Sequence, residues 1–518
     1  MSGLSATPTE AGLQRVAPLA PASVPVTLRL IVGLCGLFLA ATLGGLNNRL
    51  GTLGLDDIRG VFGFSNDDAT WLTSFYAAGE LVIMPFVAWL VSIFSLKRLE
   101  TFMLVVAVGL ACVFPCIHNL HLLVALRFFQ AAACGALIFM FMISLFFLLP
   151  AHRRMYGFGF YAMVATFAPN MGVWLTALWT DTLHGWEFLY WQSVLLGIPA
   201  LSFIQYGLPD TPGNPDRLRN SNWLGMAFAV PGTLLLALAL SQGIRLDWFH
   251  SPFITWALAS GLALLVLYVI SELNHANPFL QLRVFTHHRN VWMALLILVV
   301  VLTVSLAGVM LPVSYLGRVW AYRPLQSASV GLVIALPQFI TGPVVAFALY
   351  RRWLDARAVY IVGFLMLILG CALGARLDGE WLARHFYASQ ALLALGLPTA
   401  IISTIYMASN NINIAIGPSL GGAINTVRCL GTLAGSAILG QYLATRQHTH
   451  YEWLRDKTGL LGDGGTISLP DLTQVLNSQS SILATADAYC LLGALAVCPI
   501  LIILCMRYTP PPQAPQKT

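Results

Sequence analysis

The sequence predicts an all-helical protein that crosses a membrane about fourteen times. Of its 518 residues, 58 % are hydrophobic and only 9 % are charged, and the mean hydropathy is +0.77. A soluble chain carries about a quarter charged residues. Apolar runs of about 20 residues, long enough to cross a hydrocarbon layer of roughly 30 Å as helices, recur along the whole chain. The bilayer is therefore the solvent for most of this protein.

The apolar runs define the predicted spans in order. The first run exceeds the apolar part of a cleavable signal peptide, so we expect it to remain as a span. The predicted spans are 28–46, 69–94, 101–117, 122–149, 155–179, 186–207, 222–243, 252–272, 291–316, 326–349, 358–375, 386–408, 416–441 and 482–506. The connector PDTPGNPDRLRN (209–220) separates the first six spans from the rest. Residues 442–481 are predicted to form a polar loop. Bends are predicted at the prolines inside spans, Pro85, Pro169, Pro337 and Pro343.

The basic residues predict the orientation of the chain. The net charge is +6, but Lys and Arg are scattered over short connectors rather than gathered in a stripe, which argues against nucleic-acid binding. One side of the membrane holds Arg15, Arg29, Lys97, Arg98, Arg153, Arg154, Arg217, Arg219, Arg283, Arg289, Arg351, Arg352, Arg357, Arg507 and Lys517. The other side holds fewer, namely Arg49, Arg59, Arg245, Arg318, Arg323, Arg376, Arg384, Arg446, Arg455 and Lys457. The richer side, and with it both termini, is expected to be cytoplasmic.

Motifs for other classes of protein are missing from the sequence. The nine cysteines lie in apolar runs without a CxxC pair, which argues against disulfide and zinc frameworks. There is no GxxxxGK[ST], HExxH or GxSxG sequence for nucleotide binding or hydrolysis. His448, His450 and Glu452 belong to the predicted polar loop, where a metal site is not expected. We therefore expect neither an enzyme nor a protein with a cofactor or a bound metal.

Several segments resemble one family of transporters. They are ANPFLQLRVFTHHRN (276–290), LPVSYLGRVWAYRPLQSASVGLVIALP (311–337), LRFFQ (126–130), APNMG (168–172) and INTVRCLGTLAG (424–435). Each is similar to a segment of the EmrB/QacA-type drug:proton antiporters, which belong to the major facilitator superfamily. The resemblance covers most of the chain.

The resemblance implies a fold and a set of boundaries. The fold would be the major facilitator fold, with two six-helix bundles and two further helices inserted between them. The implied parts are a cytoplasmic tail (1–27), an N-terminal bundle (28–208), a connector with the two inserted helices (209–290), a C-terminal bundle (291–506) that includes a periplasmic loop (442–481), and a cytoplasmic tail (507–518). The family also implies a bacterial inner membrane, and a possible periplasmic adaptor and outer-membrane channel as partners.

Glu80 is the principal candidate for proton coupling. It is flanked by about ten mostly apolar residues on either side, which places it near the membrane midplane, unlike nearly all of the 21 acidic residues. An intramembrane carboxylate costs several kcal/mol unless it is paired, protonated or in contact with water, so its presence indicates function. We expect Glu80 to bind and release the coupling proton. The alternative is a structural carboxyl group hydrogen-bonded between helices.

Two arginines inside predicted spans are candidates for contacts with charged groups. Arg127, in the fourth span, is the natural counter-charge for Glu80, although it lies roughly 9 Å nearer the periplasmic side at about 1.5 Å per residue. In the resembled family the matching arginine works with an acid in the first span. The alternative for Arg127 is an arginine bound by carbonyl groups and water. Arg428, in the thirteenth span, is expected either to bind substrate or to support the structure.

Three further residues are candidates for the wall of a substrate cavity. Asn47 stands where the resembled family has its first-span acid, and it cannot ionise. Asparagine at a helix end more often caps the helix, which is the alternative for Asn47. Tyr76 and Tyr161 are expected to line a pocket for a large apolar or aromatic compound, although many aromatic residues in spans face the lipid.

Three functions are compatible with these observations. The first is proton-coupled efflux of an organic amphipathic or drug-like compound through a cavity between the two bundles. The second is transport of one specific metabolite with lost or altered proton coupling. Asn47 and the loop AWLVSIFSLKR (88–98), which departs from the loop motif of the resembled family, favour this function. The third is a membrane sensor or scaffold that transports nothing. No catalytic motif favours the third.

Overall fold

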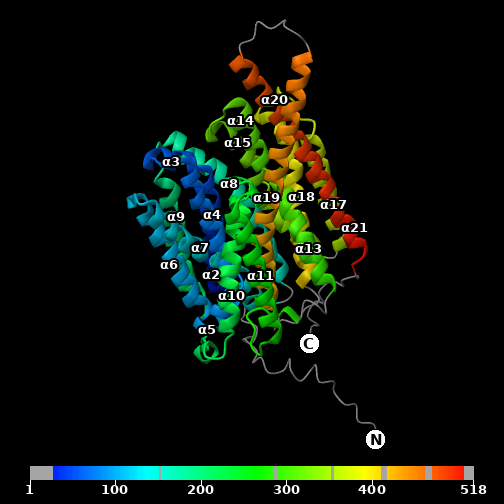
Figure 1. Cartoon of the computed structure of the whole chain (residues 1–518). Helices are drawn as coiled ribbons and strands as arrows, with labels where there is room; N and C mark the ends of the chain where they lie inside the picture. The colour runs from blue at the N-terminus through cyan, green and yellow to red at the C-terminus, as the bar shows by residue number, and fades with distance from the viewer. Residues whose placement is uncertain are drawn as a thin grey trace.

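The protein is a bundle of long helices, most of them roughly aligned (Figure 1). The computed structural model describes residues 27–150, 153–283, 289–351, 355–409, 417–460 and 469–506. All regular elements within these ranges are helical. The prediction of an all-helical fold is therefore confirmed.

We call the first group of helices the N-terminal bundle. It comprises α2 (Leu28–Leu53), α3 (Leu55–Phe62), α4 (Asn66–Ile83), α5 (Val87–Phe94), α6 (Leu96–Val113), α7 (Leu120–Leu148), α8 (Arg154–Ala177) and α9 (Phe188–Gly207). Within it α2 packs on α7, α8 and α9, and α7 packs on α4 and α6. Small residues permit this close packing, because a Cβ added at Gly33 of α2 would lie 2.7 Å from the carbonyl carbon of Gly207 in α9.

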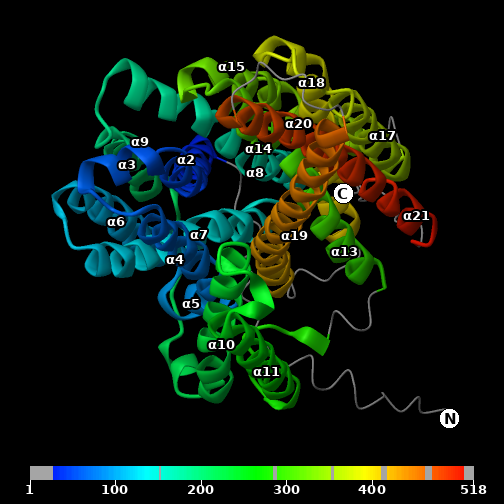
Figure 2. The ribbon, with the colours of Figure 1, turned by 45° about the horizontal axis from the view of Figure 1, so that its top comes forward.

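Two helices follow the connector and stand apart from the bundles. They are α10 (Trp223–Gln242) and α11 (Pro252–Asn274), which pack on each other. Figure 2 shows this pair at the edge of the molecule, next to α4. Helix α10 touches α4 and α19, and the Phe253 ring of α11 lies 6.1 Å from the Trp71 ring of α4.

The remaining helices form what we call the C-terminal bundle. They are α13 (Arg289–Val304), α14 (Met310–Trp320), α15 (Pro324–Ala335), α16 (Gln338–Tyr350), α17 (Ala356–Gly374), α18 (Tyr387–Ser409), α19 (Gly417–Leu460), α20 (Leu469–Leu495) and α21 (Cys498–Leu504). In this bundle α17 packs on α18, and α19 packs on α13 and α20. The two bundles meet where α8 touches α15, α16 and α18, and where α19 touches α4 and α7.

Eleven helical segments in the described ranges are long and apolar enough to cross a membrane, or twelve if α4 and α5 form one span. These two helices meet at a bend of 59°, and Pro85 lies in the break between them, as predicted. The helices α8 and α19 are not among the twelve. A total of fourteen spans requires that both of them also cross the membrane, and this count stays a prediction.

The expectation of a polar loop at residues 442–481 is largely wrong. Helix α19 continues to Leu460 and α20 begins at Leu469, so both helices extend beyond their neighbours (Figure 1). Side chains one turn apart support the extension of α19, because His448 and Glu452 form an ion pair of 3.2 Å. Charged residues at helical spacing favour a solvated helix as well as a loop, and the composition alone did not separate the two.

Candidate functional site

Glu80 lies buried where the N-terminal bundle meets the C-terminal bundle. It belongs to α4 and is only 6 % exposed. Glycines bring α4 and α7 close together at this level, because a Cβ added at Gly135 of α7 would lie 3.0 Å from Cγ of Glu80. The neighbouring Gly79 contacts the carbonyl group of Phe128 on α7. A larger residue at Gly135 would push against the Glu80 side chain, and one at Gly79 would push against the main chain of α7.

The Glu80 carboxylate forms an ion pair with the C-terminal bundle. Its Oε1 lies 2.8 Å from Nη2 of Arg428 in α19, a residue 348 positions further along the chain. Its Oε2 accepts a hydrogen bond of 2.7 Å from the side-chain amide of Asn48 in α2. The thiol of Cys429 donates to Oε1 at 3.3 Å. The Glu80–Arg428 pair therefore connects the two bundles directly.

The charges around Glu80 are not balanced. Arg49 of α2 also interacts electrostatically with Glu80, so one carboxylate faces two guanidinium groups. Removing an ion from water costs about 3 kcal/mol or more at the centre of a membrane, and pairing offsets that cost. Protonation of Glu80 would leave both guanidinium groups without a counter-charge here. Ionic attraction to Arg428 and Arg49 therefore holds the Glu80 carboxylate in this position.

Arg127 is held in a different way from the one that the sequence suggested. In the described residues no ion pair joins it to Glu80, and Arg428 occupies that position instead. Arg127 donates to the main-chain oxygen of Asn47 at 2.9 Å and to the side-chain oxygen of Gln130. Its guanidinium carbon lies 4.3 Å from the ring centroid of Tyr76. These contacts all lie within the N-terminal bundle, which corresponds to the alternative of an arginine bound by carbonyl groups.

Asn47 and Tyr76 both contact Arg127. The amide of Asn47 donates to the hydroxyl of Ser193 in α9 at 3.0 Å, and that hydroxyl donates back at 3.2 Å. Both Asn47 and Tyr76 are buried, at 2 % and 3 % exposure. Asn47 thus connects α2 to α9 in place of an ionisable group.

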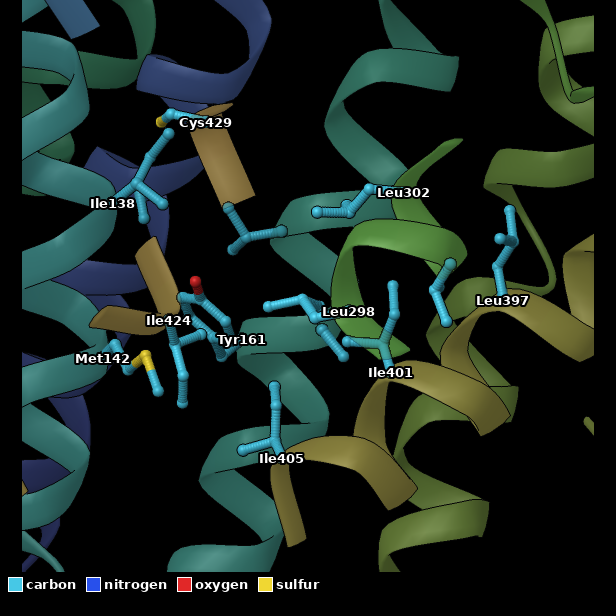
Figure 3. Packing of buried hydrophobic residues seen from close by; sticks show 14 of the residues in the cluster. Ile138, Met142, Tyr161, Leu298, Leu302, Leu397, Ile401, Ile405, Ile424 and Cys429 are labelled. Atoms are coloured by element: carbon cyan, nitrogen blue, oxygen red, sulfur yellow. The ribbon is translucent and has the colours of Figure 1, made fainter. Parts of the chain in front are cut away.

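Tyr161 lies on the contact between the bundles, near Arg428. Its hydroxyl donates a hydrogen bond of 2.8 Å to Oδ1 of Asn425 in α19, and Nε of Arg428 approaches the same oxygen at 3.4 Å. Figure 3 shows the Tyr161 ring among buried apolar side chains from both bundles, including Met142, Leu298 and Ile424. Tyr161 therefore orients the group that holds Arg428.

Sequence reasoning missed part of this site. Arg49 was assigned to a loop, but it lies in α2, which continues to Leu53. Asn425 and Cys429 were not singled out, although they lie three residues before and one residue after Arg428. The helical spacing of Asn425 and Arg428 was a usable signal, because residues three apart share a face. Within the described residues, no group of three or more His, Cys, Asp or Glu side chains could hold a metal ion.

Comparisons with known proteins agree with this architecture. A family model described as Major Facilitator Superfamily matches residues 35–436. The multidrug export protein EmrB of Haemophilus influenzae is 24 % identical over 441 residues, which are 82 % of this chain and 83 % of EmrB. The MFS-type transporter YhcA of Bacillus subtilis is 23 % identical over 438 residues, which are 84 % of this chain and 79 % of YhcA.

A solved structure gives the same result for the fold. The crystal structure of the human organic anion transporter MFSD10 covers 93 % of this chain and 100 % of its own chain, with a TM-score of 0.56 and 13 % identity. The helical two-bundle fold and the match to this family place the protein in the class of membrane transporters. Because the family model matches most of its length, this chain belongs to the Major Facilitator Superfamily. The match to EmrB confirms the resemblance found in the sequence.

Proposed function

We propose that this protein exports an organic amphipathic or drug-like compound across the bacterial inner membrane in exchange for protons, with Glu80 as the proton-binding group. The observation that carries the proposal is the Glu80–Arg428 ion pair of 2.8 Å between α4 and α19. The direction of transport and the class of compound follow from the similarity to EmrB, whose name describes multidrug export.

The ion pair provides a physical route from protonation to movement. In transporters of this architecture, the substrate site opens to one side and then to the other as one bundle moves against its neighbour. A charge pair between the bundles opposes their separation as long as the carboxylate is ionised. Protonation of Glu80 removes the negative charge, so the bundles lose this attraction and can separate. Arg428 and Tyr161 adjust the strength of the contact, whereas Arg127 and Asn47 hold the surrounding helices.

Several features of the cellular setting belong to the same proposal. Both termini lie on the cytoplasmic side, as the distribution of Lys and Arg indicates. The helical extensions of α19 and α20 then face the periplasm, where the resembled family implies an adaptor and an outer-membrane channel as partners.

The proposal is tested with purified protein reconstituted into liposomes under an imposed pH gradient. A fluorescent amphipathic dye that the wild-type protein transports serves as the substrate. Glu80→Gln keeps the size of the side chain but cannot ionise, so we expect it to lose transport driven by the pH gradient. It should still exchange labelled dye for unlabelled dye, because that exchange needs no net proton movement.

A matched control separates this effect from general damage. Glu452→Gln removes a carboxylate from the extension of α19, where its side chain is 52 % exposed, and should transport like the wild type. If Glu80→Gln retains transport driven by the pH gradient, the assignment of the proton to Glu80 is wrong. If the wild-type protein carries dye without moving protons, the chain is an uncoupled carrier.

A further inference from the structure

A groove on the C-terminal bundle has features that the proposed transport cycle does not use. It has a volume of about 310 Å³ and lies between α16, α17 and α18. Its walls are almost entirely apolar, formed by Val344, Val345 and Ala348 of α16 and by Val359 and Val362 of α17, among others. Val344 and Val362 are 56 % and 47 % exposed, so the groove opens at the surface of the molecule.

The groove has the dimensions of a site for part of an acyl chain. From Thr341 to Ala348 the wall rises about 10 Å along α16 at about 1.5 Å per residue. Ala348 and Ala358, both with small side chains, are among its lining residues. Because α16 and α17 belong to segments long and apolar enough to span a membrane, hydrocarbon is the medium that contacts this face.

Two arginines lie in the chain just beyond residues at one end of the groove, and only one of them is exposed. Arg351 follows α16 one turn after Ala348, is exposed, and places its guanidinium carbon 5.2 Å from the ring centroid of Phe347. Arg357 directly precedes Ala358 in α17 and donates to the main-chain oxygen of Met506 at 2.6 Å. No carboxylate in the described ranges forms an ion pair with Arg351. The apolar groove therefore ends about one helical turn before an exposed arginine, Arg351.

We propose that this groove binds an anionic phospholipid, with an acyl chain along α16 and α17 and the phosphate at Arg351. Basic pockets between membrane helices bind anionic head groups, and each basic residue near the surface strengthens that attraction. A zwitterionic lipid would gain the apolar contact but little from the net charge. This inference is independent of the proposed direction of transport and of the role of Glu80.

The test measures lipid binding to the full-length protein in a neutral detergent. Phosphatidylglycerol and phosphatidylcholine with the same acyl chains are titrated, and bound lipid is counted by native mass spectrometry. We expect the wild-type protein to bind phosphatidylglycerol more tightly. Arg351→Gln should weaken that binding about fivefold, and Arg351→Lys should retain most of it. Ala358→Phe fills the groove without changing the charge and should weaken the binding of both lipids.

Arg219→Gln is the control, because Arg219 is an exposed arginine in the connector, away from this groove. It should bind both lipids like the wild-type protein. Equal binding of the two lipids to the wild-type protein would mean that the groove makes only ordinary lipid contacts. The same conclusion follows if Arg351→Gln loses no more binding than Arg219→Gln. Displacement of bound lipid by the transported dye would indicate instead that the groove admits substrate from the bilayer.

Discussion

Arg428 and Arg127 are both largely buried arginines near the centre of this transporter, and they are held by opposite means. Arg428 faces a carboxylate from the other bundle, at 2.8 Å. Arg127 faces a main-chain carbonyl, an amide and aromatic rings of its own bundle. A carboxylate can take up a proton and release its partner, whereas a carbonyl or an amide does not do so near neutral pH. In the proposed cycle, protonation of Glu80 would therefore release Arg428, whereas the contacts of Arg127 would persist.

The largest expected effect concerns Arg428 and its ion pair with Glu80. Arg428→Gln leaves the Glu80 carboxylate buried without its closest cation, so we expect the free energy of unfolding to fall by about 3 kcal/mol. It should also abolish the dependence of transport on the pH gradient. Denaturant unfolding of the purified protein in mixed micelles measures the first effect, and the liposome assay measures the second.

The double variant Glu80→Gln/Arg428→Gln is the control for this prediction. The double variant removes the carboxylate as well, so the cost of burying Glu80 without Arg428 is absent and the losses from the two substitutions should be less than additive. Additive losses from the two substitutions would mean that the pair contributes no coupling energy. In that case the contact between α4 and α19 would not be the basis of the switch.

An effect of intermediate size is expected for Arg127 and its contacts within the N-terminal bundle. Arg127→Gln loses a hydrogen bond to Asn47 and the contact with the Tyr76 ring, each of which typically contributes about 1 kcal/mol, so we expect unfolding to become easier by about 2 kcal/mol. Because Glu80, the proposed proton-binding group, is not among these partners, the surviving protein should still respond to the pH gradient. The same unfolding and liposome assays are used.

Arg127→Lys serves as the matched variant, because lysine keeps the charge above the Tyr76 ring but lacks the planar fork of donors. It should lie between the wild-type protein and Arg127→Gln in stability. Loss of the pH response in Arg127→Lys, at near wild-type stability, would place Arg127 on the proton path and would remove the contrast with Arg428.

The comparison also marks what the sequence was able to predict. The membrane class, the family resemblance and the positions of Glu80 and Arg428 inside apolar runs all came from local composition and motifs. The pairing of these two residues did not, because it depends on the relative heights of α4 and α19, which are set by packing over the intervening 348 positions. Arg127 is closer to Glu80 along the chain than Arg428 is, but in the folded protein Arg428 forms the ion pair with Glu80.

Local patterns failed in a second way at the ends of helices. Arg49 followed two asparagines and was assigned to a loop, yet α2 continues past it because tertiary contacts with α8 and α9 support the helix. The polar stretch after residue 441 likewise continues as α19 and packs against α20. Hydropathy marks where a helix leaves the apolar layer, which is not the place where the helix ends.

The smallest expected effect concerns Tyr161, which is neither a partner of Arg127 nor part of the Glu80–Arg428 ion pair. Tyr161→Phe removes one hydrogen bond to Asn425 and keeps the ring among its apolar neighbours, so unfolding should become easier by about 1 kcal/mol. Tyr206→Phe, at a tyrosine that is 62 % exposed, is the control and should change little.

The transport assay then tests whether Tyr161 affects the proton response or only the packing of the bundles. The Tyr161 hydroxyl and Nε of Arg428 meet at the same oxygen of Asn425, so removing the hydroxyl takes away one of the donors at that oxygen and alters the contact of Arg428. We therefore expect the pH dependence of transport by Tyr161→Phe to shift while its maximal rate is preserved. An unchanged pH dependence, together with the loss of about 1 kcal/mol, would contradict this expectation. Tyr161 would then act only in packing the bundles together, and Glu80 and Arg428 would form the whole of the switch.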